Sequence, residues 1–170
     1  MVKAMLAKEY NLGDPKVDVK GKIASEKLDG YRAIYEGAED QFMSRQEKPF
    51  NSPDWFTMAF PKRVLDGELW IGRDNFQGMG VVRKKEPNDE EWMNVTYQVY
   101  DLIDSKEPFF KRVKELKRLV KLVQGRWKVM RKDLSYPFNT IPCPLVFVEQ
   151  IPVKSQEHLK EMYDEILAKG

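Results

Sequence analysis

The chain has 170 residues, which is enough for one domain with a real core, and its 42% hydrophobic content is ordinary for a soluble globular protein. A single cysteine, Cys143, excludes an intrachain disulfide, and no apolar run approaches the ~20 residues of a membrane helix. A net charge of +2 does not by itself indicate nucleic-acid binding. We expect a soluble intracellular protein, in the cytoplasm or the nucleus depending on its host.

Four segments have the composition of strands. Residues 22–36 read as two strands joined at Asp29-Gly30, a strong turn pair. Residues 64–71 read as two shorter pieces broken at Asp66-Gly67. Residues 95–103 are rich in β-branched and aromatic side chains and predict a central strand, and residues 145–151 predict another.

Two helices follow from apolar spacing. The first has one apolar face and is expected to end at Gly125; the face consists of Phe109, Val113, Leu116, Val120 and Val123. Ser155 can cap the second, Gly170 would sit just past its end, and its inward residues are Leu159, Met162, Tyr163, Ile166 and Leu167. Strands that do not alternate strictly with helices favour an α+β domain.

The first helix is also unusually basic. Between Lys111 and Lys132 ten cationic side chains accompany one acid, Glu115. Such a run is either a nucleic-acid surface or a solvated helix face, and the sequence leaves both open.

The common catalytic motifs are missing from the sequence. It contains no phosphate loop, no G-x-G-x-x-G and no Cys/His set for zinc, and its single histidine, His158, disfavours Ser/His/Asp catalysis. What remains is Lys27-Leu28-Asp29-Gly30, a lysine on a predicted strand beside a turn. Alternation puts Lys27 and Asp29 on the same side, where they are either a surface ion pair or part of a site.

Further short motifs follow this lysine in order. Residues 25–32, Ser-Glu-Lys-Leu-Asp-Gly-Tyr-Arg, are followed by Ser44-Arg45, by Leu-Asp-Gly-Glu-Leu at 65–69 and by Val-Tyr-Asp at 99–101. The series resembles the covalent nucleotidyltransferases, a superfamily of DNA ligases, RNA ligases and mRNA capping guanylyltransferases. Met5-Leu6-Ala7 is also similar to the start of many ligase domains. The resemblance covers roughly residues 4–170.

The resemblance implies a nucleotidyltransferase (ATP-grasp-like) adenylation domain, with antiparallel sheets flanked by helices. The chain would be the N-terminal portion of that domain, because it stops at Gly170, where the family has a further Glu-Gly strand and then a lysine-bearing motif. The C-terminal OB-fold domain of ligases would also be missing. We therefore expect weak or absent adduct formation by residues 1–170 alone.

The resemblance also implies roles for individual residues. Lys27 would take AMP from ATP, which requires a neutral amine, whereas a free lysine has a pKa near ~10.4. Partial burial and a nearby Mg²⁺ would favour the neutral form, and a cationic site is expected around Lys27. Asp29 would orient Lys27 or the incoming 3′-OH as the second catalytic residue. Arg32 would hold the terminal phosphates.

The remaining assignments concern the nucleoside and the DNA. Glu68 would bind the ribose hydroxyl and is the candidate metal ligand, while Tyr100 would stack on adenine unless it is a core tyrosine. Arg45 would lie near the ribose and later near the nick phosphate. The other nucleotide-binding candidates are Ser25, Glu26 and Leu28, and the other DNA-phosphate candidates are Arg83, Lys84 and Lys85.

Two features favour a DNA ligase within the superfamily. Residues 74–82 resemble the Phe- and Gly-containing segment that follows the third motif in small DNA ligases, and Lys27 lies close to the N-terminus, as in compact ligases. ATP, Mg²⁺ and nicked duplex DNA are the expected cofactors and partner, and a monomer with no membrane contact is expected. The alternatives are an RNA ligase, a GTP-using capping enzyme, a non-catalytic nucleotide- or nucleic-acid-binding fragment, or a structural domain with an RNA-binding helix.

Overall fold

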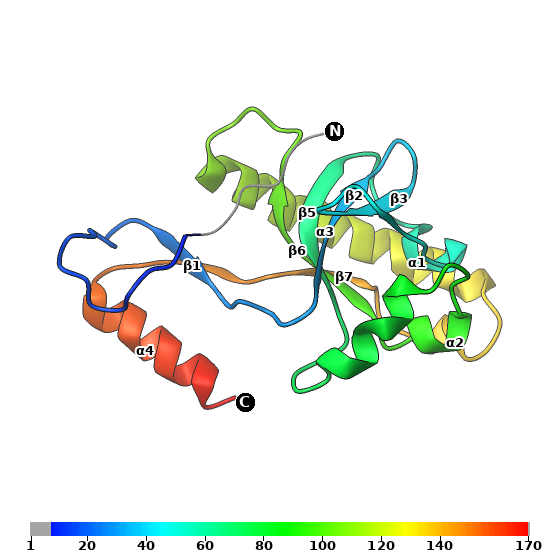
Figure 1. The fold of residues 1–170 in the computed structure, drawn as a ribbon. Helices are drawn as coiled ribbons and strands as arrows, with labels where there is room; N and C mark the ends of the chain where they lie inside the picture. Colours follow the sequence, from blue (N-terminus) through cyan, green and yellow to red (C-terminus); the bar gives the residue numbers. More distant parts are fainter. Residues whose placement is uncertain (1–7, 170) are drawn as a thin grey trace. The chain divides into compact units, whose positions relative to one another are not determined.

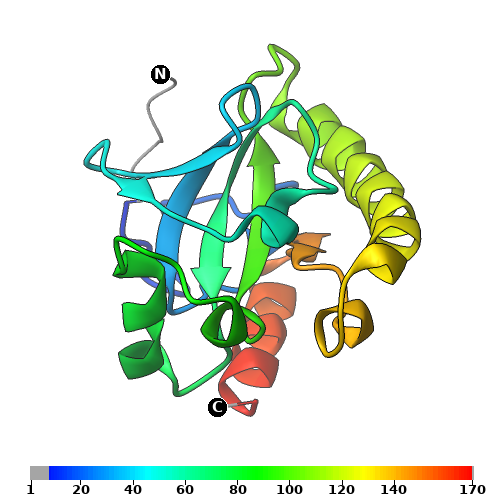
Figure 2. The ribbon, with the colours of Figure 1, turned by 90° about the vertical axis from the view of Figure 1, so that its right-hand side faces the viewer.

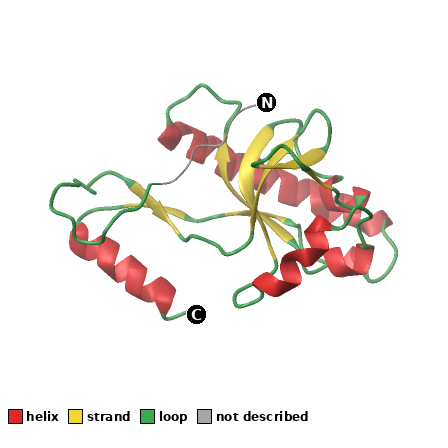
Figure 3. Ribbon diagram, in the orientation of Figure 1, coloured by secondary structure: helices red, strands yellow, loops and turns green. Residues whose placement is uncertain are grey.

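The computed structural model describes residues 8–169, which form two compact units. The larger unit is Leu28–Phe147, and the smaller one combines residues 8–27 with residues 148–169. Both contain strands and helices, as Figure 3 shows by colour. No helix among these residues has the length and apolar character needed to cross a membrane.

A six-stranded sheet forms the centre of the larger unit, in the order β4-β3-β2-β5-β6-β7 (Figure 1). Its strands are β2 (Tyr31–Glu36), β3 (Gln41–Ser44), β4 (Pro49–Phe50), β5 (Val64–Trp70), β6 (Thr96–Leu102) and β7 (Leu145–Phe147). All neighbours are antiparallel except β6 and β7, which run parallel. The predicted α+β class with antiparallel sheets and flanking helices is confirmed.

The long helix α3 (Phe109–Met130) lies along one side of this sheet (Figure 2). Its inward residues Leu116, Val120 and Trp127 are at most 2% exposed and share a cluster with the sheet residues Phe42 and Tyr97. Shorter helices complete the unit: α1 (Asp54–Thr57), η1 (Phe76–Arg83), α2 (Asp89–Trp92), η2 (Arg131–Asp133) and η3 (Phe138–Thr140).

Aromatic side chains fill much of the core. Phe42 and Tyr97 meet edge to face with ring centroids 4.8 Å apart, and Phe56 meets Trp92 in the same way at 4.8 Å. The hydroxyl of Tyr97 lies 2.9 Å from the carbonyl oxygen of Ala33 and 3.0 Å from that of Leu65, so its one proton is satisfied inside the core. Burial accordingly raises the pKa of Tyr97.

The smaller unit is a two-stranded ribbon with one helix. Strand β1 (Ile23–Ser25) pairs antiparallel with β8 (Gln150–Pro152), and α4 (Gln156–Leu167) follows. The Ser155 side chain accepts a hydrogen bond from the backbone N–H of His158, which confirms the predicted cap. The ring of His158 is half-buried, and its Nδ1 accepts from the backbone N–H of Lys154, so this histidine has a local structural partner.

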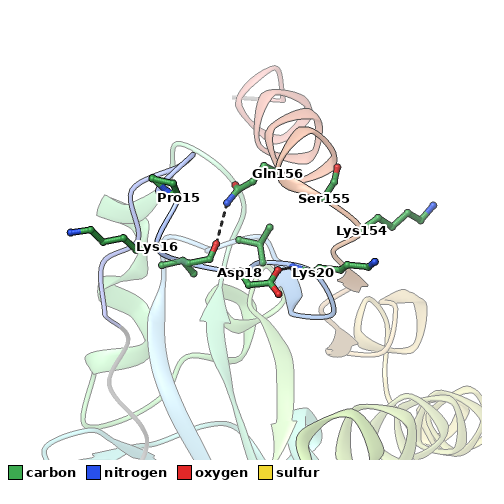
Figure 4. A pocket seen from close by; sticks show the side chains of 9 residues that line it. Pro15, Lys16, Asp18, Lys20, Lys154, Ser155 and Gln156 are labelled. Atoms are coloured by element: carbon green, nitrogen blue, oxygen red, sulfur yellow. Dashed lines mark hydrogen bonds between the residues drawn. The ribbon is translucent and has the colours of Figure 1, made fainter.

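A shallow pocket lies in the smaller unit, between residues 15–20 and residues 154–156 (Figure 4). The side-chain amide of Gln156 donates to the carbonyl oxygen of Val17 at 3.3 Å, which ties the start of α4 to the N-terminal segment. The ammonium groups of Lys16, Lys20 and Lys154 point away from the pocket.

Three strand predictions need correction. No hairpin forms at Asp29-Gly30, because β1 pairs with β8 and β2 pairs with β3 and β5. Residues 64–70 form one continuous strand rather than two pieces; only its register with β6 shifts, between Asp66 and Gly67. Residues 145–151 supply β7 and β8, which belong to different sheets. The central strand at 95–103 is confirmed as β6.

The helix ends also differ from expectation. Helix α3 continues past Gly125 to Met130, because Trp127 and Met130 extend its apolar face for another turn. In α4, Tyr163 and Leu167 are 52% and 60% exposed and do not point into a core. The predictions for Met5-Leu6-Ala7 and for Gly170 lie outside the described residues.

Candidate active site

The second face of the six-stranded sheet carries charged side chains. Alternation along β2 and β5 puts Arg32, Asp66 and Glu68 on the face opposite to the core residues Ala33 and Leu65. Arg32 lies directly across the ladder from Glu68. The strands therefore bring together residues that are more than thirty positions apart in the sequence.

Arg32 is held by Asp66 through a two-point contact. Its Nε lies 3.0 Å from Oδ1 and its NH2 lies 2.6 Å from Oδ2 of the carboxylate. The Asp66 side chain is only 4% exposed, against 22% for Arg32. The hydrogen bonds to Asp66 raise the pKa of Arg32, so the guanidinium is charged, and its plane is fixed by the paired geometry.

Tyr100 lies beside this pair. The register of β5 and β6 shifts next to it, because Asp66 faces Asp101 while Gly67 faces Val99. Its ring centroid is 5.9 Å from Cζ of Arg32, and its hydroxyl donates weakly to the carbonyl oxygen of Gly67 at 3.4 Å. Burial raises the pKa of Tyr100, which is half-buried and stands outside the core cluster. An aromatic ring thus lies next to a guanidinium on the charged side of the sheet.

Glu68 is tied to the motif that contains Lys27. One of its oxygens, Oε1, accepts a hydrogen bond of 3.1 Å from the backbone N–H of Gly30. A Cβ at position 30 would overlap the carbonyl oxygen of Leu69 and approach Cγ of Glu68 to 2.9 Å. Glycine is therefore required at position 30 by the close approach of two chain segments, and not by the hairpin turn that its sequence suggested.

Gly67 has a comparable packing role on the core side. A Cβ there would lie 2.7 Å from the carbonyl oxygen of Gln98 and 2.7 Å from the ring of Tyr97. Three consecutive residues thus have three different roles. Asp66 accepts hydrogen bonds from Arg32, and Glu68 accepts one from the backbone N–H of Gly30. Gly67, between them, leaves room for the ring of Tyr97 in the core. Alternation alone did not predict the role of Gly67, because it depends on the size of a side chain in the next strand.

The segment with Lys27 belongs in part to the smaller unit. Strand β1 ends at Ser25, and residues 26–28 have no regular structure, so Lys27 is not on a strand as predicted. Ser25, Lys27 and Asp29 are exposed, and Glu26 and Leu28 are partly buried. The exposure of Lys27 differs from the partial burial that we expected for its amine.

The proposed DNA-facing cations lie on three different elements. Arg45 is exposed in the turn after β3, where the hydroxyl of Ser44 accepts from the backbone N–H of Lys48. Arg83 ends η1 with its Cζ 5.8 Å from the ring centroid of Tyr31. Exposed Lys84 and Lys85 follow, and Lys84 makes an ion pair of 2.6 Å with Glu91 that offsets its charge.

Glu68 is the residue that the sequence suggested as a metal ligand. Within residues 8–169 no group of three or more His, Cys, Asp and Glu side chains is arranged to hold an ion. Mg²⁺ commonly binds through one or two carboxylates together with substrate phosphates, and a single carboxylate fits an ion delivered with a nucleotide. The described residues do not fit a metal cage made only of protein groups.

Similarity to known proteins identifies the family of this chain. The chain belongs to the family of the ATP dependent DNA ligase domain, whose model matches residues 4–170. These matches do not favour the RNA ligase or capping alternatives.

Individual relatives agree with that assignment. A DNA ligase from Haemophilus influenzae is 29% identical over 148 residues, covering 87% of this chain and 48% of its own length. A solved Lig E DNA ligase, described as binding DNA with a minimal scaffold, gives a TM-score of 0.76 at 26% identity, covering all of this chain and 59% of that one. Chlorella virus DNA ligase-adenylate shares the fold, with a TM-score of 0.64 at 20% identity over 87% of this chain and 50% of that one. The chain thus spans about half the length of the relatives that it matches.

Proposed function

We propose that this domain carries out the nucleotidyl-transfer chemistry of an ATP-dependent DNA ligase. The Lys27 amine attacks the α-phosphorus of ATP; a P–N bond forms, the bond to the bridging oxygen breaks, and pyrophosphate leaves. A 5′-phosphate at a nick in duplex DNA then takes the AMP, and the 3′-OH displaces it to form the phosphodiester. The observation that carries the proposal is the gathering of Arg32, Glu68 and Tyr100 on one face of the sheet.

In this proposal each group on the charged face has a defined task. Tyr100 offers its ring to adenine, Glu68 accepts from a ribose hydroxyl, and Arg32, oriented by Asp66, binds the terminal phosphates. Glu68 would also hold Mg²⁺, which offsets charge on the departing pyrophosphate. Glu68 also accepts from the backbone N–H of Gly30, which follows Lys27 by three residues.

The residues near Lys27 and the outer cations complete the scheme. Asp29 orients the Lys27 amine or the incoming 3′-OH, and the backbone of residues 25–28 lies against the nucleotide. Arg45 contacts the ribose and then the nick phosphate. Arg83, Lys84 and Lys85 contact the DNA backbone. Lys84 leaves its ion pair with Glu91 and binds a phosphate instead. The ligase acts as a monomer.

The decisive experiment follows covalent AMP transfer. Full-length ligase is incubated with ATP labelled at the α-phosphate and with Mg²⁺. We expect an acid-labile protein–AMP adduct that Lys27→Ala abolishes and that the matched control Lys22→Ala retains, because Lys22 is an exposed lysine just before β1. An undiminished adduct in Lys27→Ala would remove the assignment. Sealing of nicked DNA in preference to nicked RNA separates the proposed activity from that of an RNA ligase.

A further inference from the structure

The outer surface of α3 carries cationic side chains that the proposed reaction does not use. Lys114, Arg118, Lys121 and Lys128 are all exposed, whereas Leu116 and Trp127 on the other side of the helix are buried. With 3.6 residues per turn, the four cations fall within an arc of roughly 80° and extend over about 21 Å of helix axis. We call these four residues the outer stripe.

The outer stripe differs from several other cations of the same segment, which have partners in the protein. Lys111 pairs with Glu107 at 2.9 Å and Arg112 with Asp101 at 2.8 Å, while Arg126 and Arg131 donate to backbone carbonyl oxygens. For the four stripe residues, no ion pair or hydrogen bond to another side chain occurs within the part of the chain that the structure describes. The one acid of the segment, Glu115, is bound to Arg63 at 2.9 Å. The positive charge of the stripe is therefore not offset locally.

A glycine lies within this arc. Gly125 is exposed, and a Cβ built at this position would meet no heavy atom within 4 Å. Glycine is less favourable than alanine inside a helix, and the open space around position 125 shows that packing within the protein does not require it. The missing side chain does, however, leave a gap between Lys121 and Lys128 through which another molecule's backbone can approach the helix.

We propose that the outer stripe binds the sugar-phosphate backbone of duplex DNA without reading its sequence. Duplex DNA presents one negative charge per about 1.7 Å of axis, so a row of cations about 21 Å long matches a continuous series of phosphates. Helix α3 packs on the core face of the sheet, away from Arg32 and Glu68. The stripe thus engages a different stretch of DNA from the one at the nick, and the inference holds whether or not Lys27 is adenylylated.

The test measures how binding of an intact, nick-free duplex depends on salt. The triple variant Lys114→Gln, Lys121→Gln, Lys128→Gln is compared with a control of the same charge change, Lys16→Gln, Lys62→Gln, Lys106→Gln, at three exposed lysines elsewhere. The slope of log K against log salt becomes less negative by about 0.9 for each lost phosphate contact, so we expect its magnitude to fall by about 3 in the stripe variant. It should be unchanged in the control.

Two results would overturn the proposal. An unchanged slope in the stripe variant would show that these lysines do not contact DNA, and an equal fall in the control would show that only bulk charge matters. Because exposed Leu122 and Val129 border the stripe, an acidic protein surface is the competing partner. Loss of poly-glutamate binding with DNA binding intact would establish that partner instead. Lys27 adenylylation should be the same in all three proteins, which separates this result from the proposed reaction.

Discussion

The two faces of the six-stranded sheet are built on different principles. The core face is apolar and aromatic, and residues such as Phe42 and Tyr97 meet through ring contacts whose energy depends mainly on area and shape. The charged face holds Arg32, Asp66 and Glu68 through directed hydrogen bonds. The stability of the core face thus depends on the volume of its side chains, whereas the arrangement of the charged face depends on the direction of its hydrogen-bond donors and acceptors.

The core face should give the largest effect on stability. Trp127 is 1% exposed and contacts Trp55 across the core, so Trp127→Ala should lower the free energy of unfolding by about 3–5 kcal/mol. Leu122 lies on the same helix but is 68% exposed, and Leu122→Ala should change stability by no more than ~0.5 kcal/mol. Urea denaturation measures both. Equal losses would mean that α3 does not pack through the Trp127 side.

Two glycines should respond in opposite ways to a single added methyl group. Gly67→Ala places a Cβ against the Tyr97 ring and the Gln98 carbonyl, and should destabilise the fold by about 1–3 kcal/mol. Gly125→Ala meets open space in a helix and should stabilise it by about 0.5–1 kcal/mol. Thermal melting of the two variants gives opposite shifts. A loss of stability at Gly125 would contradict the open surroundings found there.

The apolar features of the fold were predictable because they repeat along the chain. β-Branched and aromatic composition identified β6, and Ser155 identified the start of α4. Helical spacing identified the buried residues Leu116, Val120 and Val123 of α3, although Phe109, predicted on the same face, is exposed. The errors occurred where distant segments decide the outcome. Asp29-Gly30 is a dipeptide typical of hairpin turns, yet glycine is needed at position 30 because the carbonyl oxygen of Leu69, in another strand, leaves no room for a Cβ. A glycine such as Gly125 is typical of a helix end, yet the helix continues because Trp127, beyond it, packs in the core.

The candidate site was predictable in part for a different reason. The positions of Arg32, Glu68 and Tyr100 came from the order of short motifs, and the structure places all three on one side of the sheet. The two-point contact of Arg32 with Asp66 was not predicted, because strand register depends on pairing that the sequence does not specify. The roles of these three residues, of Lys27 and Asp29, and of the proposed DNA-contacting cations stay predictions until adduct formation and DNA binding are measured.

A weaker ion pair provides the contrast to Arg32 and Asp66. Asp104 accepts from Arg63 at 2.8 and 3.0 Å, but the two side chains are 27% and 34% exposed. Burial acts to raise the pKa of Asp104, yet the hydrogen bonds from Arg63 and from the Val64 N–H outweigh it and leave the pKa below its ordinary value. We expect Asp104→Asn to cost about 0.5–1 kcal/mol at neutral pH, within the range of exposed pairs.

The pH dependence of this effect has a definite sign. Because the folded-state pKa of Asp104 is lowered, its stabilising contribution is complete above the unfolded value of about 3.9 and is lost as the pH falls through the folded value. The stability difference between the parent protein and Asp104→Asn should therefore be constant from neutral pH down to about pH 5, and should shrink below about pH 4. Urea denaturation at a series of pH values measures it. A difference that grew on acidification would mean that the carboxylate is strained in the folded protein rather than stabilised by Arg63.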